Sequence, residues 1–253
     1  DCSSRRQVVM RQKLWVFRPS NPALQMNLSR ALSISPVTAS ILMARGVTSA
    51  DEATRWMSGD QGGLHDPFLL PDMEAAIDRL QRALRGNERV CFYGDYDVDG
   101  VSATSLYLSF YRGLGGQAIP YIPHRVQEGY GLNEAAIRHL SQEGVTLLIT
   151  SDCGTTSHRE IALAAQLGID VVVTDHHQTD ETMPSAVAVL NPHRRDARYP
   201  FRGLCSAGLA YKVVSAYCRK YGAGELPPES FLDLVALATV ADVVPLQDEN
   251  RIL

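Results

Sequence analysis

The chain has little cysteine and no excess of positive charge, and each shortage excludes a class of protein. Its 253 residues include only five cysteines, and these lack the paired spacings of a zinc site or a disulfide framework. The formal net charge is −4, so no global positive field indicates a nucleic-acid partner. Any such partner must contact local basic patches. Scattered cysteines fit a reducing cytoplasm best.

Long apolar runs are also missing. No stretch reaches the roughly 18 apolar residues of a membrane span, and the first residues, DCSSRRQVVMRQK, lack the continuous apolar segment of a signal peptide. We therefore expect a cytoplasmic protein with no membrane partner. With 45% hydrophobic residues, the chain has enough apolar side chains for one large domain or two small ones.

The first quarter of the chain has the pattern of several short helices. Between residues 28 and 57, apolar residues recur at three- and four-residue spacings, with breaks at a Ser-Pro and an Arg-Gly pair. The segment GGLHDPFLLPDM follows and resembles a linker, and the next helical run covers residues 74–84. We predict an N-terminal helical arm and linker over residues 1–72 and a catalytic domain over residues 73–253.

Beyond that helical run, short β-rich segments alternate with segments of helical composition. The β-rich runs are VCFY at Val90, AIPYI at Ala118, TLLIT at Thr146, DVVVT at Asp170 and AVAVL at Ala186. This alternation predicts an α/β fold with a parallel sheet flanked by helices. Right-handed crossovers would then bring the carboxyl ends of all the strands to one edge of the sheet.

Three of the predicted strands run directly into acidic or imidazole side chains. VCFY leads into GDYDVDG, TLLIT into SDCG, and DVVVT into DHH. Because open α/β sheets bind ligands at the carboxyl ends of their strands, we expect these side chains to converge. The residues concerned are Asp95, Asp97, Asp99, Asp152, Asp175, His176 and His177.

So many carboxylates need a compensating positive charge, because like charges at short range raise one another's pKa. Carboxylates with imidazoles and no thiolate suit Mg²⁺ or Mn²⁺. Two such ions about 4 Å apart would activate a water and clamp an in-line displacement at phosphorus. Asp242, in the apolar stretch ATVADVVP, is a further candidate ligand, since an unpaired buried aspartate is costly.

Simpler interpretations of the single motifs stay open. D-x-D-x-D-G at residues 95–100 also begins an EF-hand loop, but Leu106 stands where that loop needs glutamate, and a strand-like run precedes it. Asp152 alone is more typical of a helix N-cap than of a metal ligand, and the DHH segment alone is equally typical of a polar turn. Asp242 has the alternatives of an N-cap or a surface residue.

Two segments have features of substrate-binding loops. PYIPHRVQEGYGL places Arg125 and Tyr130 beside a Gly-rich turn, which suits phosphate binding and base stacking. NPHRRDARYPFRG is basic and aromatic, and Ser206 shortly after it begins a predicted helix whose N–H groups would bind an anion. The alternative for both segments is a solvated loop whose arginines pair with acidic neighbours.

In order along the chain, these motifs resemble those of the DHH phosphoesterase superfamily. They are YGDYDVDGVSATSLY, LLITSDCGTT, VVVTDHHQ, LNPHRRD with LCSAGLAYK, and LATVADVVPLQDENR. WVFRPSNP, LSISPVTASILMARGVTSADEA and IPHRVQEGYGL resemble the RecJ branch, the single-stranded-DNA-specific exonucleases. The resemblance covers nearly everything from Trp15 to Leu253.

The resemblance implies a hydrolase that removes nucleotides from the 5′ end of single-stranded DNA in recombination and repair, with a centre of two Mn²⁺ or Mg²⁺ ions. The ligands that it implies are Asp97, Asp99, Asp152, His176 and Asp242, with Asp95 as a further candidate. His177 matches the histidine that contacts the scissile phosphate. We expect catalytic roles for Asp99, Asp152 and His177, and substrate contacts from Arg125, His177 and Ser206.

One departure from the superfamily pattern concerns Tyr93, which stands where many members have a metal-binding histidine. RecJ members also continue into a second domain and an oligonucleotide-binding barrel, which these residues do not include. A single-stranded-DNA-binding protein and a helicase are further expected partners. The alternatives are a phosphodiesterase for short oligonucleotides or cyclic dinucleotides, and a non-catalytic nucleic-acid-binding relative.

Overall fold

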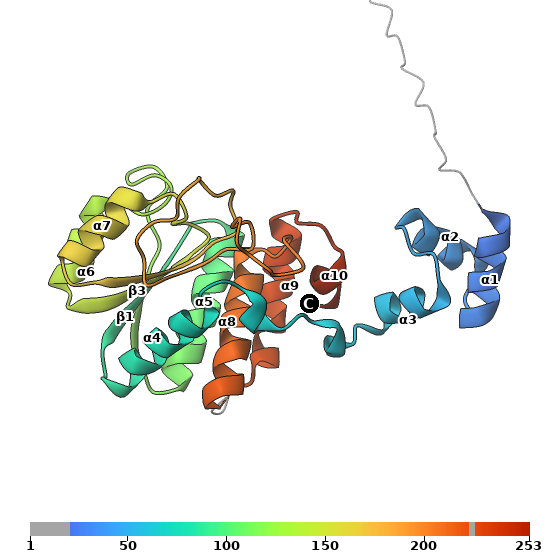
Figure 1. Cartoon of the computed structure of the whole chain (residues 1–253), viewed down its shortest axis with the longest axis horizontal. Coiled ribbons are helices and arrows are strands. Elements are labelled where there is room, and N and C mark those ends of the chain that lie inside the picture. The colour runs from blue at the N-terminus through green and yellow to red at the C-terminus, as the bar shows by residue number, and fades with distance from the viewer. Residues whose placement is uncertain (1–20, 223–225) are drawn as a thin grey trace, which may run out of the picture. The chain divides into compact units, whose positions relative to one another are not determined.

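The computed structural model describes residues 21–222 and 226–253, which divide into two compact units on either side of the Ser58–Gly59 bond (Figure 1). Cys2 and most of the WVFRPSNP segment lie outside the described residues. None of the described helices is long and apolar enough to cross a membrane.

The N-terminal unit consists of three short helices, α1 (Pro22–Leu32), α2 (Pro36–Ala44) and α3 (Ala50–Ser58). Proline is the first residue of α1 and of α2, where its missing N–H costs nothing. Asn21 and Ser35 cap these helices by accepting a backbone N–H through their side chains. A small core around Leu28 and Leu42 joins the helices, which confirms the predicted helical segment.

The second unit contains a five-stranded parallel sheet. Its strands lie in the order β2 (Gln117–Tyr121), β1 (Arg89–Gly94), β3 (Val145–Ser151), β4 (Asp170–Thr174), β5 (Ala188–Leu190). All five predicted strands are present, and β5 is shorter than expected. Along the chain, β2 follows β1 and pairs with one edge of it, and β3 then pairs with the other edge of β1. The ends of β1 and β3 therefore border the switch point at which such sheets bind ligands.

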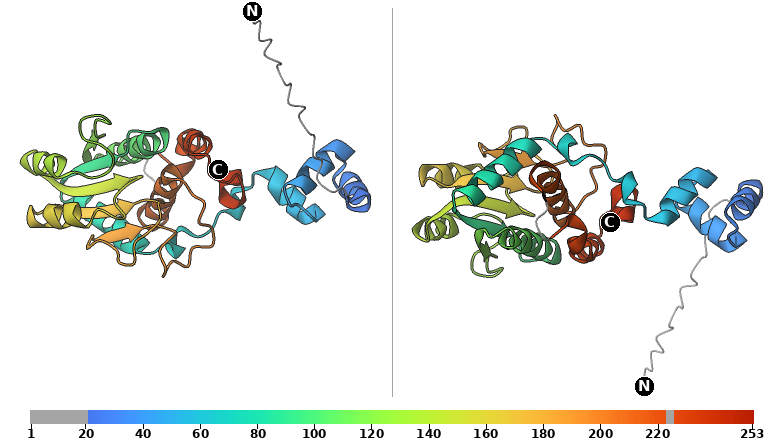
Figure 2. Two further views of the ribbon diagram at one scale, coloured as in Figure 1. Left: turned by 90° about the horizontal axis from the view of Figure 1, so that it is seen from above. Right: turned by 90° about the horizontal axis from the view of Figure 1, so that it is seen from below.

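Helices cover both faces of the sheet (Figure 2). Strand residues alternate between the faces, so Phe92 packs with α4 (Met73–Arg85), α5 (Val98–Gly113) and α8 (Ser206–Tyr221). Tyr93 packs on the opposite face with α6 (Glu134–Gln142) and α7 (His158–Gln166). The helix α9 (Leu232–Ala241) lies against α5 and α8, and the short α10 (Asp248–Ile252) follows it. The predicted α/β fold is confirmed.

The segment before α4 belongs to the sheet unit. It contains the 3₁₀ turns η1 (Gln61–Gly63) and η2 (Pro67–Leu69), and a third turn, η3 (Pro228–Phe231), precedes α9. Pro67 and Leu70 are buried, and Leu70 is part of the core around α4 and α8. The division between the compact units therefore comes earlier than the boundary at 72/73 expected from the sequence, because buried apolar residues follow the Gly-rich start of this segment.

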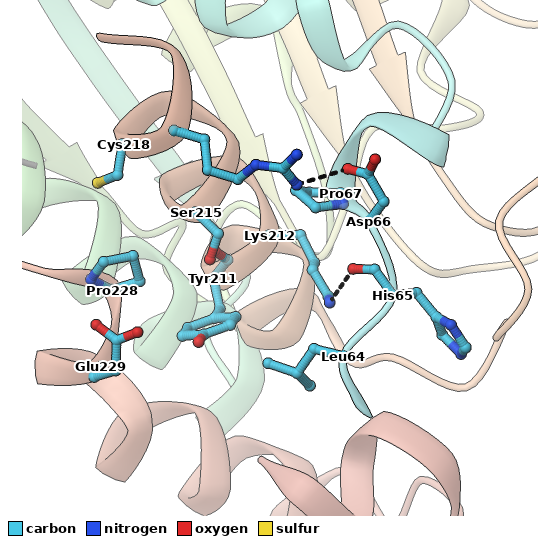
Figure 3. A pocket seen from close by; sticks show the side chains of 11 residues that line it. Leu64, His65, Asp66, Pro67, Tyr211, Lys212, Ser215, Cys218, Pro228 and Glu229 are labelled. Atoms are coloured by element: carbon cyan, nitrogen blue, oxygen red, sulfur yellow. Dashed lines mark hydrogen bonds and ion pairs between the residues drawn. The ribbon is translucent and has the colours of Figure 1, made fainter. Parts of the chain in front are cut away.

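A buried ion pair joins α8 to α10. The Lys212 ammonium contacts the Glu249 carboxylate, and it also donates to the His65 carbonyl oxygen at 3.0 Å, beside a groove of about 610 Å³ (Figure 3). Glu249 accepts further hydrogen bonds from the His65 backbone N–H and the Tyr199 hydroxyl. Burial lowers the pKa of Lys212, and the Glu249 charge opposes that effect. Each of the two buried charges therefore has a partner.

We expect Lys212→Met to lower the free energy of unfolding by about 3–5 kcal/mol, because it leaves the Glu249 carboxylate buried without its cation. Lys212→Met with Glu249→Gln should recover most of that loss, since the glutamine carbonyl oxygen still accepts the His65 N–H, and its NH2 group can donate to the Tyr199 hydroxyl once that hydroxyl rotates. Urea unfolding followed by circular dichroism measures both. Equal losses in the single and double variants would show that charge compensation is not the cause.

Candidate metal centre

The carboxyl ends of three neighbouring strands bring the predicted residues to one edge of the sheet. Asp95, Asp97 and Asp99 follow β1, Asp152 follows β3, and the DHH segment at residues 175–177 follows β4. Asp242 reaches the same place from the end of α9, which packs against α5. The convergence expected from the strand pattern is present in the structure.

His176 lies at the middle of three carboxylates. Its Nε2 atom is 3.1 Å from Oδ1 of Asp152 and 3.6 Å from Oδ2 of both Asp99 and Asp242. Burial by itself would lower the pKa of His176, but the Asp152 hydrogen bond and the nearby negative charges raise it overall. One atom each from Asp99, His176 and Asp242 lie within 4.8 Å of one another, a spacing that fits a single cation.

A second group of carboxylates adjoins the first. Asp95, Asp97 and Asp152 each have an oxygen within 4.8 Å of the others. Oδ1 of Asp95 is buried and has no hydrogen-bond partner among the described residues. Burial raises the pKa of Asp95, and the charge of Asp97 adds to this effect. A buried, unpaired carboxylate oxygen costs free energy, and a cation would stabilise it.

Asp152 links the two groups, because it belongs to the second and contacts His176 of the first. Its pKa is that expected of a cation ligand without its cation. It is 2% exposed, and its φ of +65° places it in the left-handed region, which aspartate tolerates better than most residues. Burial raises its pKa to about 7, with Asp99 and Asp97 adding to the rise and His176 opposing it. A divalent ion would restore the ionised form. It is no N-cap, since α7 begins only at His158.

The donors present fit Mg²⁺ or Mn²⁺. They are carboxylate oxygens with one or two imidazoles, which these ions prefer to a set of thiolates. Cys205 is close to Asp99, but burial raises the pKa of its thiol to about 12, so it stays protonated. An EF-hand is excluded because strand β1, instead of a helix, precedes the acidic loop.

The N-terminus of α8 holds Asp99 in place. The backbone N–H groups of Ser206 and Ala207 donate to its two carboxylate oxygens at 2.6 and 2.8 Å. The Ser206 hydroxyl donates to Asp152 at 3.2 Å. These N–H groups were expected to bind a substrate anion, but Ser206 is fully buried and the anion it binds is Asp99. The N-terminus of a helix is the end at which its dipole attracts an anion.

His177 faces a different neighbour from His176. Its Nδ1 atom lies 2.7 Å from Oδ1 of Asp175 and 3.2 Å from the Tyr130 hydroxyl, and its side chain is 49% exposed against 14% for His176. The Asp175 hydrogen bond raises the pKa of His177 to about 9, despite partial burial. Burial would raise the pKa of Asp175, but bonds from His177 and Thr155 lower it to about 2. A cavity of about 300 Å³ opens beside this pair.

The loop residues predicted to bind substrate have different surroundings. Arg125 is exposed, and its guanidinium lies 5.1 Å from the centre of the Tyr96 ring. Arg194, from the basic NPHRRD segment, is buried and pairs with Asp72 and Asp196. For Arg194 the alternative of pairing with acidic neighbours is therefore correct.

Two further residues adjoin this centre, and sequence reasoning predicted the contacts of neither. Asn191 donates to the carbonyl oxygen of His177 at 2.9 Å and to the Thr155 hydroxyl at 3.0 Å, so it stabilises the DHH turn. Tyr93 is buried, and its hydroxyl donates to the carbonyl oxygen of Gly131 at 2.8 Å. Its position directly after β5, within the LNPHRRD motif, was the available signal for the role of Asn191.

Comparison with known proteins identifies the family. The model described as the DHH family, N-terminal domain, matches residues 89–239. The chain belongs to the DHH family. The matched residues include β1 to β5 and most of α9, and every candidate metal ligand except Asp242 lies within them.

Individual relatives of this DHH chain are RecJ proteins. It is 40% identical over 238 residues to the single-stranded-DNA-specific exonuclease RecJ of Bacillus subtilis, covering 94% of this chain and 29% of that protein. A crystal structure of exonuclease RecJ bound to manganese is 36% identical with a TM-score of 0.65, over 72% of this chain and 46% of that one. RecJ from Thermus thermophilus in complex with Mn²⁺ is 29% identical with a TM-score of 0.71, over 92% and 32%. The predicted resemblance is confirmed, and the chain spans less than half of each of these relatives.

Proposed function

We propose that this chain contains the metal-binding domain of a 5′–3′ exonuclease that hydrolyses single-stranded DNA in recombination and repair. The observation that supports it is the position of His176 Nε2, within 3.6 Å of oxygens of Asp99, Asp152 and Asp242. Similarity to RecJ supports single-stranded DNA as the substrate. The 5′ polarity rests on the family resemblance.

The acidic cluster would hold Mn²⁺ or Mg²⁺, the ions named for the RecJ structures. The proposed ligands are Asp97, Asp99, Asp152, His176 and Asp242, with Asp95, the remaining member of the second group, as a further candidate. When bound, two such ions lower the pKa of a coordinated water and neutralise charge on the phosphoryl group. The protein contributes the position of each carboxylate, and α8 fixes Asp99 through Ser206 and Ala207.

His177 would act on the phosphate directly. Its raised pKa keeps the imidazole protonated, and the bond to Asp175 orients the ring. A cationic donor fixed in this way stabilises a non-bridging phosphoryl oxygen most strongly when charge develops in the transition state. Arg125 would bind a neighbouring phosphate, because a guanidinium matches phosphate geometry with two parallel N–H bonds. Ser206 would affect the substrate only through Asp99 and Asp152.

An enzyme for single strands depends on proteins that produce and protect them. We therefore propose a helicase and a single-stranded-DNA-binding protein as partners, with the cytoplasm as the compartment. Neither partner is needed for the hydrolysis itself.

Digestion of end-labelled DNA tests this function. We expect the chain to release mononucleotides from the 5′ end of a single-stranded oligonucleotide with Mn²⁺ or Mg²⁺, to leave duplex DNA intact, and to be inactive in EDTA. Dinucleotides and cyclic dinucleotides serve as competing substrates. Turnover of the dinucleotides without digestion of the long single strand would contradict the exonuclease and indicate a phosphodiesterase for short substrates. Absence of divalent-ion binding in calorimetry would contradict both enzyme functions.

A further inference from the structure

The loop between β2 and α6 (residues 122–133) places Arg125 beside the metal centre. The Cζ atom of Arg125 lies 5.1 Å from the centre of the Tyr96 ring, a cation–π contact. Tyr96 stands in the chain between Asp95 and Asp97, two residues of the acidic cluster. The positive charge of Arg125 acts on Asp95 and opposes the rise in its pKa caused by burial. The guanidinium is therefore already close to the carboxylates.

Glu128 stabilises the turn that carries Arg125. One carboxylate oxygen accepts the backbone N–H of His124 at 2.7 Å, and the other accepts the Tyr121 hydroxyl at 2.6 Å and the Asn133 amide at 3.3 Å. These bonds join the end of β2, the start of the turn and the N-cap of α6. They lower the pKa of Glu128, with the His124 bond as the largest cause, so the carboxylate is charged near neutral pH.

The far end of the loop is attached to the core and to the metal centre. The Tyr130 hydroxyl donates to the carbonyl oxygen of Asp152 at 2.9 Å. The Tyr93 hydroxyl donates to the carbonyl oxygen of Gly131 at 2.8 Å and accepts from Asn133 at 3.3 Å. Gly129 has a φ of +80° and Gly131 a φ of +84°, a conformation that other residues rarely adopt. Tyr93, which replaces the histidine of other superfamily members, thus contacts this loop.

We propose that Tyr96 and Glu128 are positioning residues, which fix the Arg125 guanidinium for phosphate binding before the substrate arrives. This inference rests on the proposed function, since it needs a phosphate at Arg125. An unrestrained arginine loses rotamer entropy when it is immobilised, and contact with a ring removes part of that cost in advance. A guanidinium held over a ring in this way keeps its N–H groups available for a phosphate.

A double-mutant cycle between Tyr96 and Arg125 tests the stacking. We expect Tyr96→Leu to raise KM for a single-stranded oligonucleotide about two- to fivefold, the weight of an exposed cation–π contact, with kcat nearly unchanged. Tyr96→Phe keeps the ring and should behave as the wild type. In an Arg125→Ala background, Tyr96→Leu should have no further effect. Calorimetry should show the same Mn²⁺ affinity for all of these variants.

A matched pair of variants tests the turn. Glu128→Gln should raise KM in the same way as Tyr96→Leu, whereas Gln127→Ala, at an exposed position of the same turn, should not. An equal rise in both would assign the effect to general loosening of the loop and overturn the role of Glu128. Persistence of the Tyr96→Leu effect in Arg125→Ala, or a parallel fall in Mn²⁺ affinity, would overturn the role of Tyr96.

Binding of the same oligonucleotide in EDTA separates this inference from the proposed function. A chain that binds DNA in EDTA but hydrolyses none of it after Mn²⁺ is added would refute the exonuclease, while the cycle between Tyr96 and Arg125 would still appear in the dissociation constants. If Arg125→Ala leaves binding unchanged, no phosphate contacts this guanidinium, and the positioning roles are wrong.

Discussion

Asp152→Asn is expected to reduce hydrolysis of single-stranded DNA by at least about a hundred- to a thousandfold, the cost of removing one charge-stabilising group. Asp152 belongs to the group with Asp95 and Asp97 and also contacts His176 at 3.1 Å, so its loss affects both candidate cation positions. Asp99→Asn should have a similar effect, because the two N–H groups of α8 would then face a neutral amide. Both variants should lose Mn²⁺ affinity in calorimetry.

Thermal melting without metal serves as the control for folding. At position 152, asparagine has nearly the shape of aspartate and removes a charge whose ionisation burial already opposes, so we expect the metal-free fold of Asp152→Asn to stay intact. Asp233→Asn, at the exposed start of α9, is a matched substitution and should leave both the rate and the Mn²⁺ affinity unchanged. Wild-type rates for Asp152→Asn at equal metal concentration would remove that residue from the proposed centre.

Alanine substitutions of the two adjacent histidines, His176 and His177, are expected to cause different defects. His176→Ala should weaken Mn²⁺ binding and regain part of its activity at high Mn²⁺, because its Nε2 atom lies among three carboxylates. His177→Ala should keep most of the Mn²⁺ affinity but lose turnover that added metal does not restore, because its imidazole is bonded to Asp175 and half-exposed.

Calorimetry with Mn²⁺ beside steady-state rates distinguishes the two histidine variants. Asp175→Asn offers a further check, since it removes the carboxylate that orients His177 and should reproduce part of the His177→Ala defect. One atom of His177 does lie within 4.8 Å of atoms of Asp152 and His176, so a role as a third ligand is the competing assignment. Rescue of His177→Ala by metal would establish that assignment in place of ours.

Much of the fold was predictable because its signals are local. Each strand is a short run of β-branched and apolar residues, and each of the first three is followed along the chain by a helix of ordinary length. The start of α5 lies within the acidic motif, since Asp97 caps the helix by accepting the N–H of Gly100 and the helix begins at Val98. An aspartate within an acidic metal motif gives no separate signal for this second role as a cap.

Less of the surroundings of the site was predictable, because side-chain partners far apart in the sequence decide them. The NPHRRD segment has the composition of a nucleic-acid patch, yet Arg194 turns inward to Asp72, 122 positions before it. Pro67 and Leu70 resemble parts of a linker but are buried with the sheet unit. Composition records which charges and apolar groups exist, and packing determines which of them meet.

The sequence by itself determined the parallel α/β sheet, the edge at which the acidic residues gather and the family, because strand periodicity and the residues just after each strand are properties of short segments. Only the tertiary structure decided how the gathered residues divide their tasks. The N–H of Ser206 meets Asp99 across 107 positions of the chain, Asp175 orients His177, and Tyr93 contacts the Arg125 loop. Such pairings depend on which helices and loops pack together, and no local pattern records that choice.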